Sequence, residues 1–106
     1  MSKKKIITFG EYIRGLREQV GLPLRKIAAQ LDIDPSLLGK IERSQRQPTK
    51  EQIKKLAEIF KQDEHFLLSE NLSDLIANKI IEEGSDIDIL RVAEQKVNYF
   101  KKKKNG

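Results

Sequence analysis

Apolar side chains recur along this chain at the three- and four-residue spacing of amphipathic helices. No segment shows the alternation of apolar and polar residues that indicates a half-buried strand. The pattern therefore predicts an all-α protein. Two of the clearest helical faces consist of Phe9, Ile13, Leu16 and Val20, and of Ile53, Leu56, Ala57 and Phe60.

Residues that start and stop helices divide this pattern into separate elements. Thr8 with Glu11, and Thr49 with Gln52, have the spacing of a capping box, in which each side chain bonds the backbone N–H of the other residue. Gly21 is a typical helix end. The predicted elements are five helices over residues 6–70, the fifth very short and capped by Asp63, and two further helices over residues 71–100.

The charge balance changes along the chain and indicates a boundary near residues 69–73. Residues 1–70 contain 14 Lys and Arg against 10 Asp and Glu, whereas residues 71–100 contain 3 against 6. A basic N-terminal part favours a polyanionic partner, because neutralised phosphates release their counterions. We expect a domain over 6–70, a helical extension over 71–100, and a disordered basic tail over 101–106.

Residues 24–43 have the pattern of two short helices that cross at a steep angle. A small side chain is needed at the crossing, and Ala28 meets this need. Asp34 can cap the second helix, with Pro35 in its first position. The outward positions of that helix carry no large apolar group, so they form a polar face about as wide as the DNA major groove. These outward residues are Pro35, Ser36, Gly39, Lys40 and Arg43.

Taken together, these residues resemble the phage repressor and Cro-like (Xre) family of helix-turn-helix regulators. The resemblance implies a five-helix repressor-like domain that binds double-stranded DNA sequence-specifically, acting as a homodimer on an inverted repeat. It covers about Phe9 to Leu68 and is carried by Leu16-Arg17, Gly21-Leu22, Ile27-Ala28, Leu31, Leu38, Lys40-Ile41-Glu42-Arg43, Pro48 and Leu56-Ala57.

Several positions depart from the family pattern, among them Gly39 inside the recognition helix, where glycine should cost about 0.5–1 kcal/mol against alanine, a cost that is bearable if the backbone must approach the base edges closely. Pro23-Leu24 replaces the usual Ser-Gln at the start of the second helix, so a phosphate contact from that glutamine is missing. Asp32 stands at the glycine of the turn, and Ser44 at the glycine after the third helix. Asp32 can adopt the left-handed conformation of that glycine at small cost. Because Ser44 replaces the second glycine, the end of the third helix is expected to differ from the family.

The resemblance also implies roles for individual residues. Arg17 and Glu42 are expected to form a partly buried ion pair between the first and third helices. Base contacts are expected from Ser36 and Lys40, and Leu37 either meets a thymine methyl or fills the core. Phosphate contacts, or else simple solvation, are expected for the basic residues at helix ends and in the loop, namely Arg25, Lys26, Arg43, Arg46 and Lys50.

The last predicted helix has more apolar surface than is needed to dock on its own domain. A homodimer interface would cover the excess. The alternative is that this helix folds back on the chain, with dimerisation left to the fourth and fifth helices. The residues expected at the interface are Ile89, Leu90, Val92, Val97, Tyr99 and Phe100.

Other classes of function find little support in the sequence. The chain has no cysteine and one histidine, His65, which does not make a zinc site, and we expect no metal or cofactor. No nucleophile-histidine arrangement or phosphate loop is visible, so we expect no enzyme. Without an apolar run of membrane-spanning length or a signal peptide, a cytoplasmic protein is expected.

Three readings of the function stay open. The first is a transcription regulator, for which short Xre-like proteins with a helical extension suggest the controllers of restriction-modification gene clusters. The second is an antitoxin-type module that binds a partner protein through residues 70–100 as well as its own promoter. A DNA-binding fold that has lost DNA binding and serves assembly is a third reading.

Overall fold

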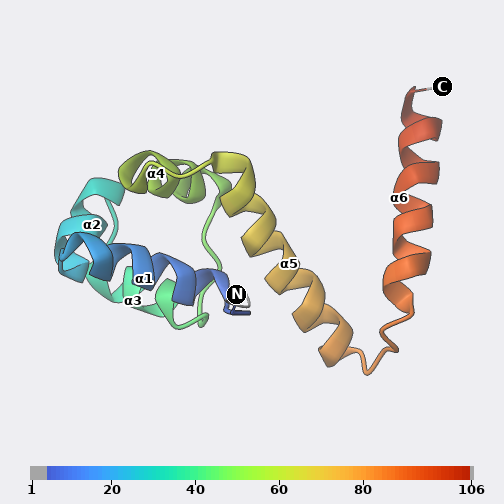
Figure 1. Ribbon diagram of the computed structural model, residues 1–106, viewed down its shortest axis with the longest axis horizontal. Helices are drawn as coiled ribbons and strands as arrows, with labels where there is room; N and C mark the ends of the chain where they lie inside the picture. The colour runs from blue at the N-terminus through green and yellow to red at the C-terminus, as the bar shows by residue number, and fades with distance from the viewer. Residues whose placement is uncertain (1–4, 106) are drawn as a thin grey trace. The chain divides into compact units, whose positions relative to one another are not determined.

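The computed structural model describes residues 5–105 and contains helices and loops in that range, with no strand (Figure 1). The prediction of an all-α protein is confirmed. The helices are α1 (Phe9–Val20), α2 (Leu24–Leu31), α3 (Pro35–Glu42), α4 (Lys50–Phe60), α5 (Glu64–Glu82) and α6 (Ile89–Asn105). No helix in the described part of the chain is long and apolar enough to cross a membrane.

Both predicted capping boxes are present. The Thr8 hydroxyl accepts a hydrogen bond from Glu11 N at 3.0 Å, and the Glu11 carboxylate accepts one from Thr8 N at 2.8 Å. Thr49 and Gln52 form the same pair of bonds at the start of α4. Gly21 ends α1 with a φ of 70°, a conformation that glycine adopts without strain. These local signals therefore set the helix ends as the sequence indicated.

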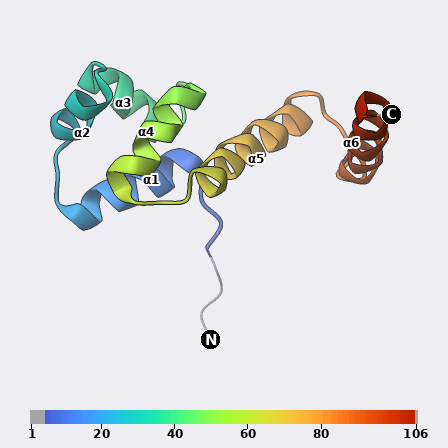
Figure 2. The ribbon, with the colours of Figure 1, turned by 90° about the horizontal axis from the view of Figure 1, so that it is seen from above.

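The helices α1 to α4 and the first turns of α5 enclose one hydrophobic core (Figure 2). Ala28 is fully buried, which fits its place at the predicted crossing of α2 and α3. The expectation that Val20 faces the core is wrong, because the last turn of α1 leaves that side chain 54% exposed. The largest fully buried side chains are Ile13, Ile27, Leu38, Ile41, Ile53, Leu56 and Leu67.

The structure has one continuous helix, α5, where the sequence suggested a short fifth helix and a separate sixth. Asp63 does cap its start, since its carboxylate accepts a hydrogen bond from Phe66 N at 2.8 Å. No glycine or proline interrupts residues 64–82. The hydroxyl of Ser73 donates to the carbonyl of Glu70 at 2.9 Å, so this polar residue is satisfied within the helix. Nothing at residues 69–73 therefore breaks the helix.

Asp74 connects α5 to the start of α1. Its carboxylate Oδ2 accepts a hydrogen bond from Phe9 N at 2.7 Å, across 65 residues of chain. Phe9 is the first residue of α1, and its N–H has no partner inside that helix. A carboxylate is also favoured at a helix N-terminus by the helix dipole. The bond therefore fixes where the first half of α5 lies on the domain.

The chain divides into two compact units, the first ending at Asp74 and the second beginning at Leu75, within α5. The second unit contains the end of α5 and the whole of α6, and α6 buries no residue in this structure. Lys101 to Lys104 belong to α6, contrary to the expected disordered tail. Lysine is a good helix former, and its charge suits the C-terminal end of a helix dipole.

At Gly10, α1 lies so close to the backbone of α3 that there is no room for a side chain. A Cβ at this position would overlap the carbonyl oxygens of Ile41 and Glu42, which belong to the backbone and cannot rotate away. A Cβ at Gly15, further along α1, would have no atom of another residue within 4 Å beyond its own helix backbone and chain neighbours. The close packing of α1 on α3 therefore requires glycine at residue 10 but not at residue 15.

We expect Gly10→Ala to lower the free energy of unfolding by about 1–3 kcal/mol, because α1 must move off α3. Gly15→Ala is the matched control and should raise it by about 0.5–1 kcal/mol, since alanine is the better helix former. Urea denaturation of both variants measures these changes. Equal effects of the two substitutions would contradict the close approach.

Candidate nucleic-acid interface

The turn between α2 and α3 is built around Asp32. This residue has a φ of 57°, so the aspartate adopts the left-handed conformation that the family's glycine would take. The next N–H, that of Ile33, donates to the carbonyl of Ala28 at 3.0 Å. Two short helices joined by this tight turn form the geometry that presents a second, recognition helix to DNA.

Two hydrogen bonds join Ser36 to Asp34 at the start of α3. The Asp34 carboxylate accepts hydrogen bonds from both Ser36 N and Ser36 Oγ, each at 2.8 Å. These two bonds lower the pKa of Asp34, with the positive charge of Lys40 a smaller cause. Because the Ser36 hydroxyl gives its hydrogen to Asp34, its oxygen can only accept a bond from a ligand.

The expectation that α3 ends differently because serine replaces glycine at residue 44 is wrong for its backbone. Ser44 has a φ of 62°, so serine takes the left-handed conformation that glycine would normally supply. The N–H of Gln45 then donates to the carbonyl of Lys40 at 2.8 Å and closes the helix. The helix therefore ends at Glu42, with Arg43 as its capping residue.

The structure brings Arg17 and Glu42 together in a bidentate ion pair. Arg17 Nε lies 2.8 Å from Glu42 Oε2, and Nη2 lies 3.0 Å from Oε1. The third guanidinium nitrogen, Nη1, donates to the carbonyl of Leu22 at 3.0 Å. The Arg17 and Glu42 side chains are only 13% and 5% exposed. The hydrogen bond to Glu42 raises the pKa of Arg17, and the pair ties the end of α3 to α1.

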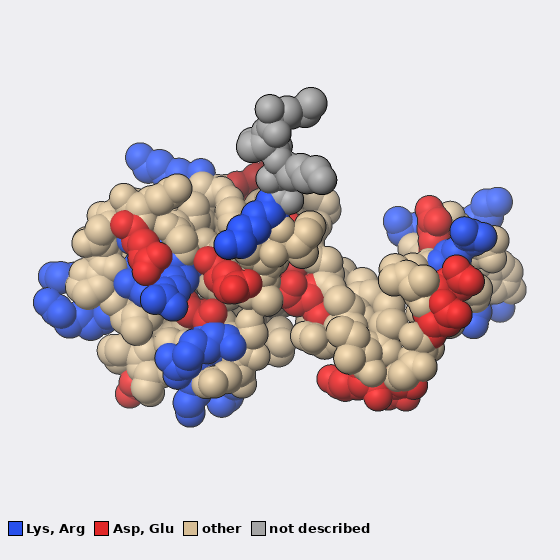
Figure 3. Space-filling model, turned by 60° about the horizontal axis from the view of Figure 1, so that its bottom comes forward, with Lys and Arg blue, Asp and Glu red and all other residues tan. Residues whose placement is uncertain are grey.

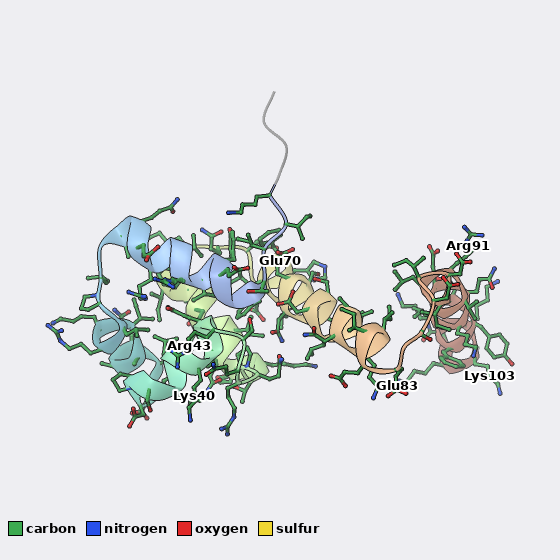
Figure 4. The ribbon with its side chains drawn as sticks, turned by 90° about the horizontal axis from the view of Figure 1, so that it is seen from below. Lys40, Arg43, Glu70, Glu83, Arg91 and Lys103 are labelled. Carbon is green, nitrogen blue, oxygen red and sulfur yellow. The ribbon has the colours of Figure 1, made fainter. Side chains whose placement is uncertain are left out.

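The remaining expected contact residues are distributed over the domain surface. Ser36, Lys40 and Arg43 are exposed on α3, and Figure 4 shows Lys40 and Arg43 projecting from that helix. Leu37 is half-buried and packs against the core, so the core-filling alternative accounts for part of this side chain. Figure 3 shows Lys and Arg side chains at several places over the domain, with carboxylates among them. Those expected at phosphates, Arg25, Lys26, Arg46 and Lys50, are all exposed.

Two residues that shape this site were missed by the sequence reasoning. Gly10 permits the close approach of α1 to the last turn of α3, and Asp74 bonds the first N–H of α1. A glycine in the first turn of a helix was a usable signal for the first. Nothing in the sequence near Asp74 distinguishes it from other acidic residues on a helix surface.

We expect Arg17→Ala to lower the free energy of unfolding by about 3–5 kcal/mol, because Glu42 would be left as a buried charge without its partner. Arg14→Ala is the matched control. Arg14 also pairs with a carboxylate of α1, Glu18, but both side chains are more than half exposed, so a change of about 0.5 kcal/mol or less is expected. Similar losses in thermal or urea denaturation would count against a structural role for the buried pair.

Comparison with known proteins agrees with this geometry. A helix-turn-helix family profile matches residues 13–67, about half of the chain. Among solved structures, the complex of SinR protein with SinI protein contains a similar chain, with a TM-score of 0.53 and 21% identity over 93% of this chain and 100% of that one. No curated protein sequence matches. With more than half of its residues matched and with the turn geometry described above, the chain belongs to the helix-turn-helix family of Cro/C1-type DNA-binding transcription regulators.

Proposed function

We propose that this DNA-binding regulator acts as a homodimer on an inverted-repeat operator, with α3 of each subunit in the major groove. The observation that carries the proposal is the outer face of α3, where Ser36 and Lys40 are exposed and the one large apolar side chain between them that is not fully buried, Leu37, is half-buried. The bacterial cytoplasm, where its DNA target lies, is then its place of action. The ion pair of Arg17 with Glu42 supports a fixed orientation of this face.

Base recognition on this face follows from the bonding capacity of each side chain. Ser36 can accept a bond from an amino group of adenine or cytosine, because its hydrogen is given to Asp34. Lys40 can donate to the O6 and N7 acceptors of guanine. The exposed part of Leu37 can contact a thymine methyl. Each side chain therefore suits a different group at the base edges.

Phosphate contacts would fix the domain on the duplex. Arg25 and Lys26 are exposed in the first turn of α2, and Arg46 and Lys50 are exposed in the loop before α4 and in its first turn. Contacts of this kind position a protein without reading sequence. They also make binding fall steeply as salt is raised.

The apolar face of α6 supports dimerisation through the second unit. One domain reads only a few base pairs, so two recognition helices about 34 Å apart are usually needed for specificity. The six side chains expected at the interface are between 41% and 59% exposed. A second copy of α6 would remove this surface from water, and the acidic residues of 71–100 would keep the dimer contact away from DNA.

A foreign protein on α6 is the second candidate. The SinR chain was solved in complex with SinI, another protein. An antitoxin-type role, with a partner on residues 70–100, would use the same exposed face. The mass of the complex purified from its native host separates the two: a stoichiometric foreign subunit favours the antitoxin. Control of a restriction-modification cluster rests on the sequence resemblance, and the genes beside this one test it.

For base recognition, we expect Lys40→Ala to change which operator variants are preferred, by about 1–3 kcal/mol at one base pair. Arg46→Ala is the control and should weaken all sequences by a similar factor, because a phosphate contact carries no base information. Titration of both variants against a panel of single-base operator variants measures this. A uniform loss with Lys40→Ala would reassign Lys40 to a phosphate.

For dimerisation, we expect Val97→Asp to weaken self-association at least about tenfold, because a charge would enter an apolar interface. Val97 is 50% exposed within one chain, so its replacement should leave the subunit folded. Asn98→Asp adds the same charge on the polar side of α6 and should have little effect. Sedimentation equilibrium gives the dissociation constants. An unchanged dimer in Val97→Asp would point to α4 and α5 instead.

A further inference from the structure

Gly39 lies inside α3 and is nevertheless buried. The three atoms nearest to a Cβ placed on it would all come from the guanidinium of Arg43, with Nη1 closest at 3.1 Å. Unlike Gly10, it is therefore not approached by the backbone of another helix. These nearest atoms belong to the charged end of one flexible side chain, that of the residue that caps α3.

A glycine in this position makes a helix less stable than alanine would. At Gly10 the close approach of α1 to α3 explains that cost. At Gly39 the fold offers no such reason, because a Cβ would meet nothing but the guanidinium of Arg43 at its closest contacts. The feature that depends on the missing side chain is therefore the position of the guanidinium.

That position is on the face that would enter the groove. Ser36, Gly39 and Arg43 are three and four residues apart, so they share one side of α3. Helical side chains lean towards the N-terminus, and the Arg43 guanidinium lies level with Gly39, about one turn back from its own Cα. It therefore lies near the middle of the exposed face instead of at its C-terminal edge, where phosphate contacts would be expected.

The donors of the Arg43 guanidinium are also not used within the described part of the chain. Across residues 5–105, no carboxylate pairs with Arg43 and no side-chain hydrogen bond involves it, whereas Arg17 uses three nitrogens within the protein. Arginine carries five N–H donors in a planar fork. This fork matches the O6 and N7 acceptors of guanine, which is the commonest specific contact in the major groove.

We propose that Arg43 is a specificity-determining residue that reads a guanine in each half-site. Because Gly39 has no side chain, the guanidinium can pack against the helix there, on the groove-facing side of α3. The assignment rests on the proposed entry of α3 into the major groove. It replaces the phosphate contact that the sequence suggested for Arg43. Lysine would keep the charge but could not form the same fork.

Selection of bound sites from a library of random double-stranded DNA tests the assignment in the full-length protein. Wild type should select one guanine per half-site that Arg43→Ala no longer selects, with discrimination at that base pair falling by about tenfold or more. Arg46→Ala is the matched control, because it removes the same charge; it should bind more weakly but select the same sites as wild type.

Gly39→Ala is the second variant, because its Cβ would lie 3.1 Å from Nη1 and push the guanidinium outward by a few tenths of an ångström, while leaving Arg43 in the chain. It should weaken the same guanine preference and no other, and circular dichroism should show the helical content of wild type. The assignment is overturned if Arg43→Ala still selects the wild-type guanine, or if it weakens all sequences alike.

The same experiments give a different result if α3 does not enter the major groove at all. If α3 does not read bases, wild type selects no sequence and Lys40→Ala changes nothing. If α3 reads bases without Arg43, Lys40→Ala shifts the selected sites while Arg43→Ala does not.

Discussion

The orientation of α3 depends on how its last turn is held against α1. Two contacts meet there: Gly10 lets the α1 backbone approach the carbonyls of Ile41 and Glu42, and Arg17 holds the Glu42 carboxylate through two hydrogen bonds. The first contact is steric and the second is electrostatic. A buried ion pair contributes little net stability but is costly to break, so it selects one arrangement of the two helices. The exposed face of α3 is therefore presented in one orientation.

Further contacts hold the start of α3, the start of α1 and the first half of α5 in place. Asp34 caps the start of α3, and its carboxylate accepts hydrogen bonds from both the N–H and the hydroxyl of Ser36. Asp74 closes the start of α1 and belongs to α5, the helix that continues into the second unit. Tyr12 donates to Gln62 at 2.9 Å and contacts the ring of Phe66, which adds to the attachment of α5. Recognition helix, first helix and the start of α5 are thus fixed to one another.

Much of the fold was predictable because its signals are local. Capping boxes at Thr8 and Thr49, the cap at Asp34 and the apolar periodicity of α4 each lie within one or two helical turns. The continuity of α5 was not predicted, because a change of charge at residues 69–73 was interpreted as a boundary, although charge alone does not end a helix. Of the site, the pair of Arg17 with Glu42 was expected from the family resemblance. The bond from Phe9 to Asp74 and the position of Arg43 over Gly39 depend on side chains brought together by the fold, which residue spacing does not reveal.

The central claim is that two copies of α3 read the major groove of one operator. Methylation interference tests it most directly, because dimethyl sulfate marks guanine N7 in the major groove and adenine N3 in the minor groove. The account predicts two groups of N7-methylated guanines that block binding, with centres about 10 base pairs apart on one face of the duplex. Interference from adenine N3 alone, or from a single group of guanines, would contradict it.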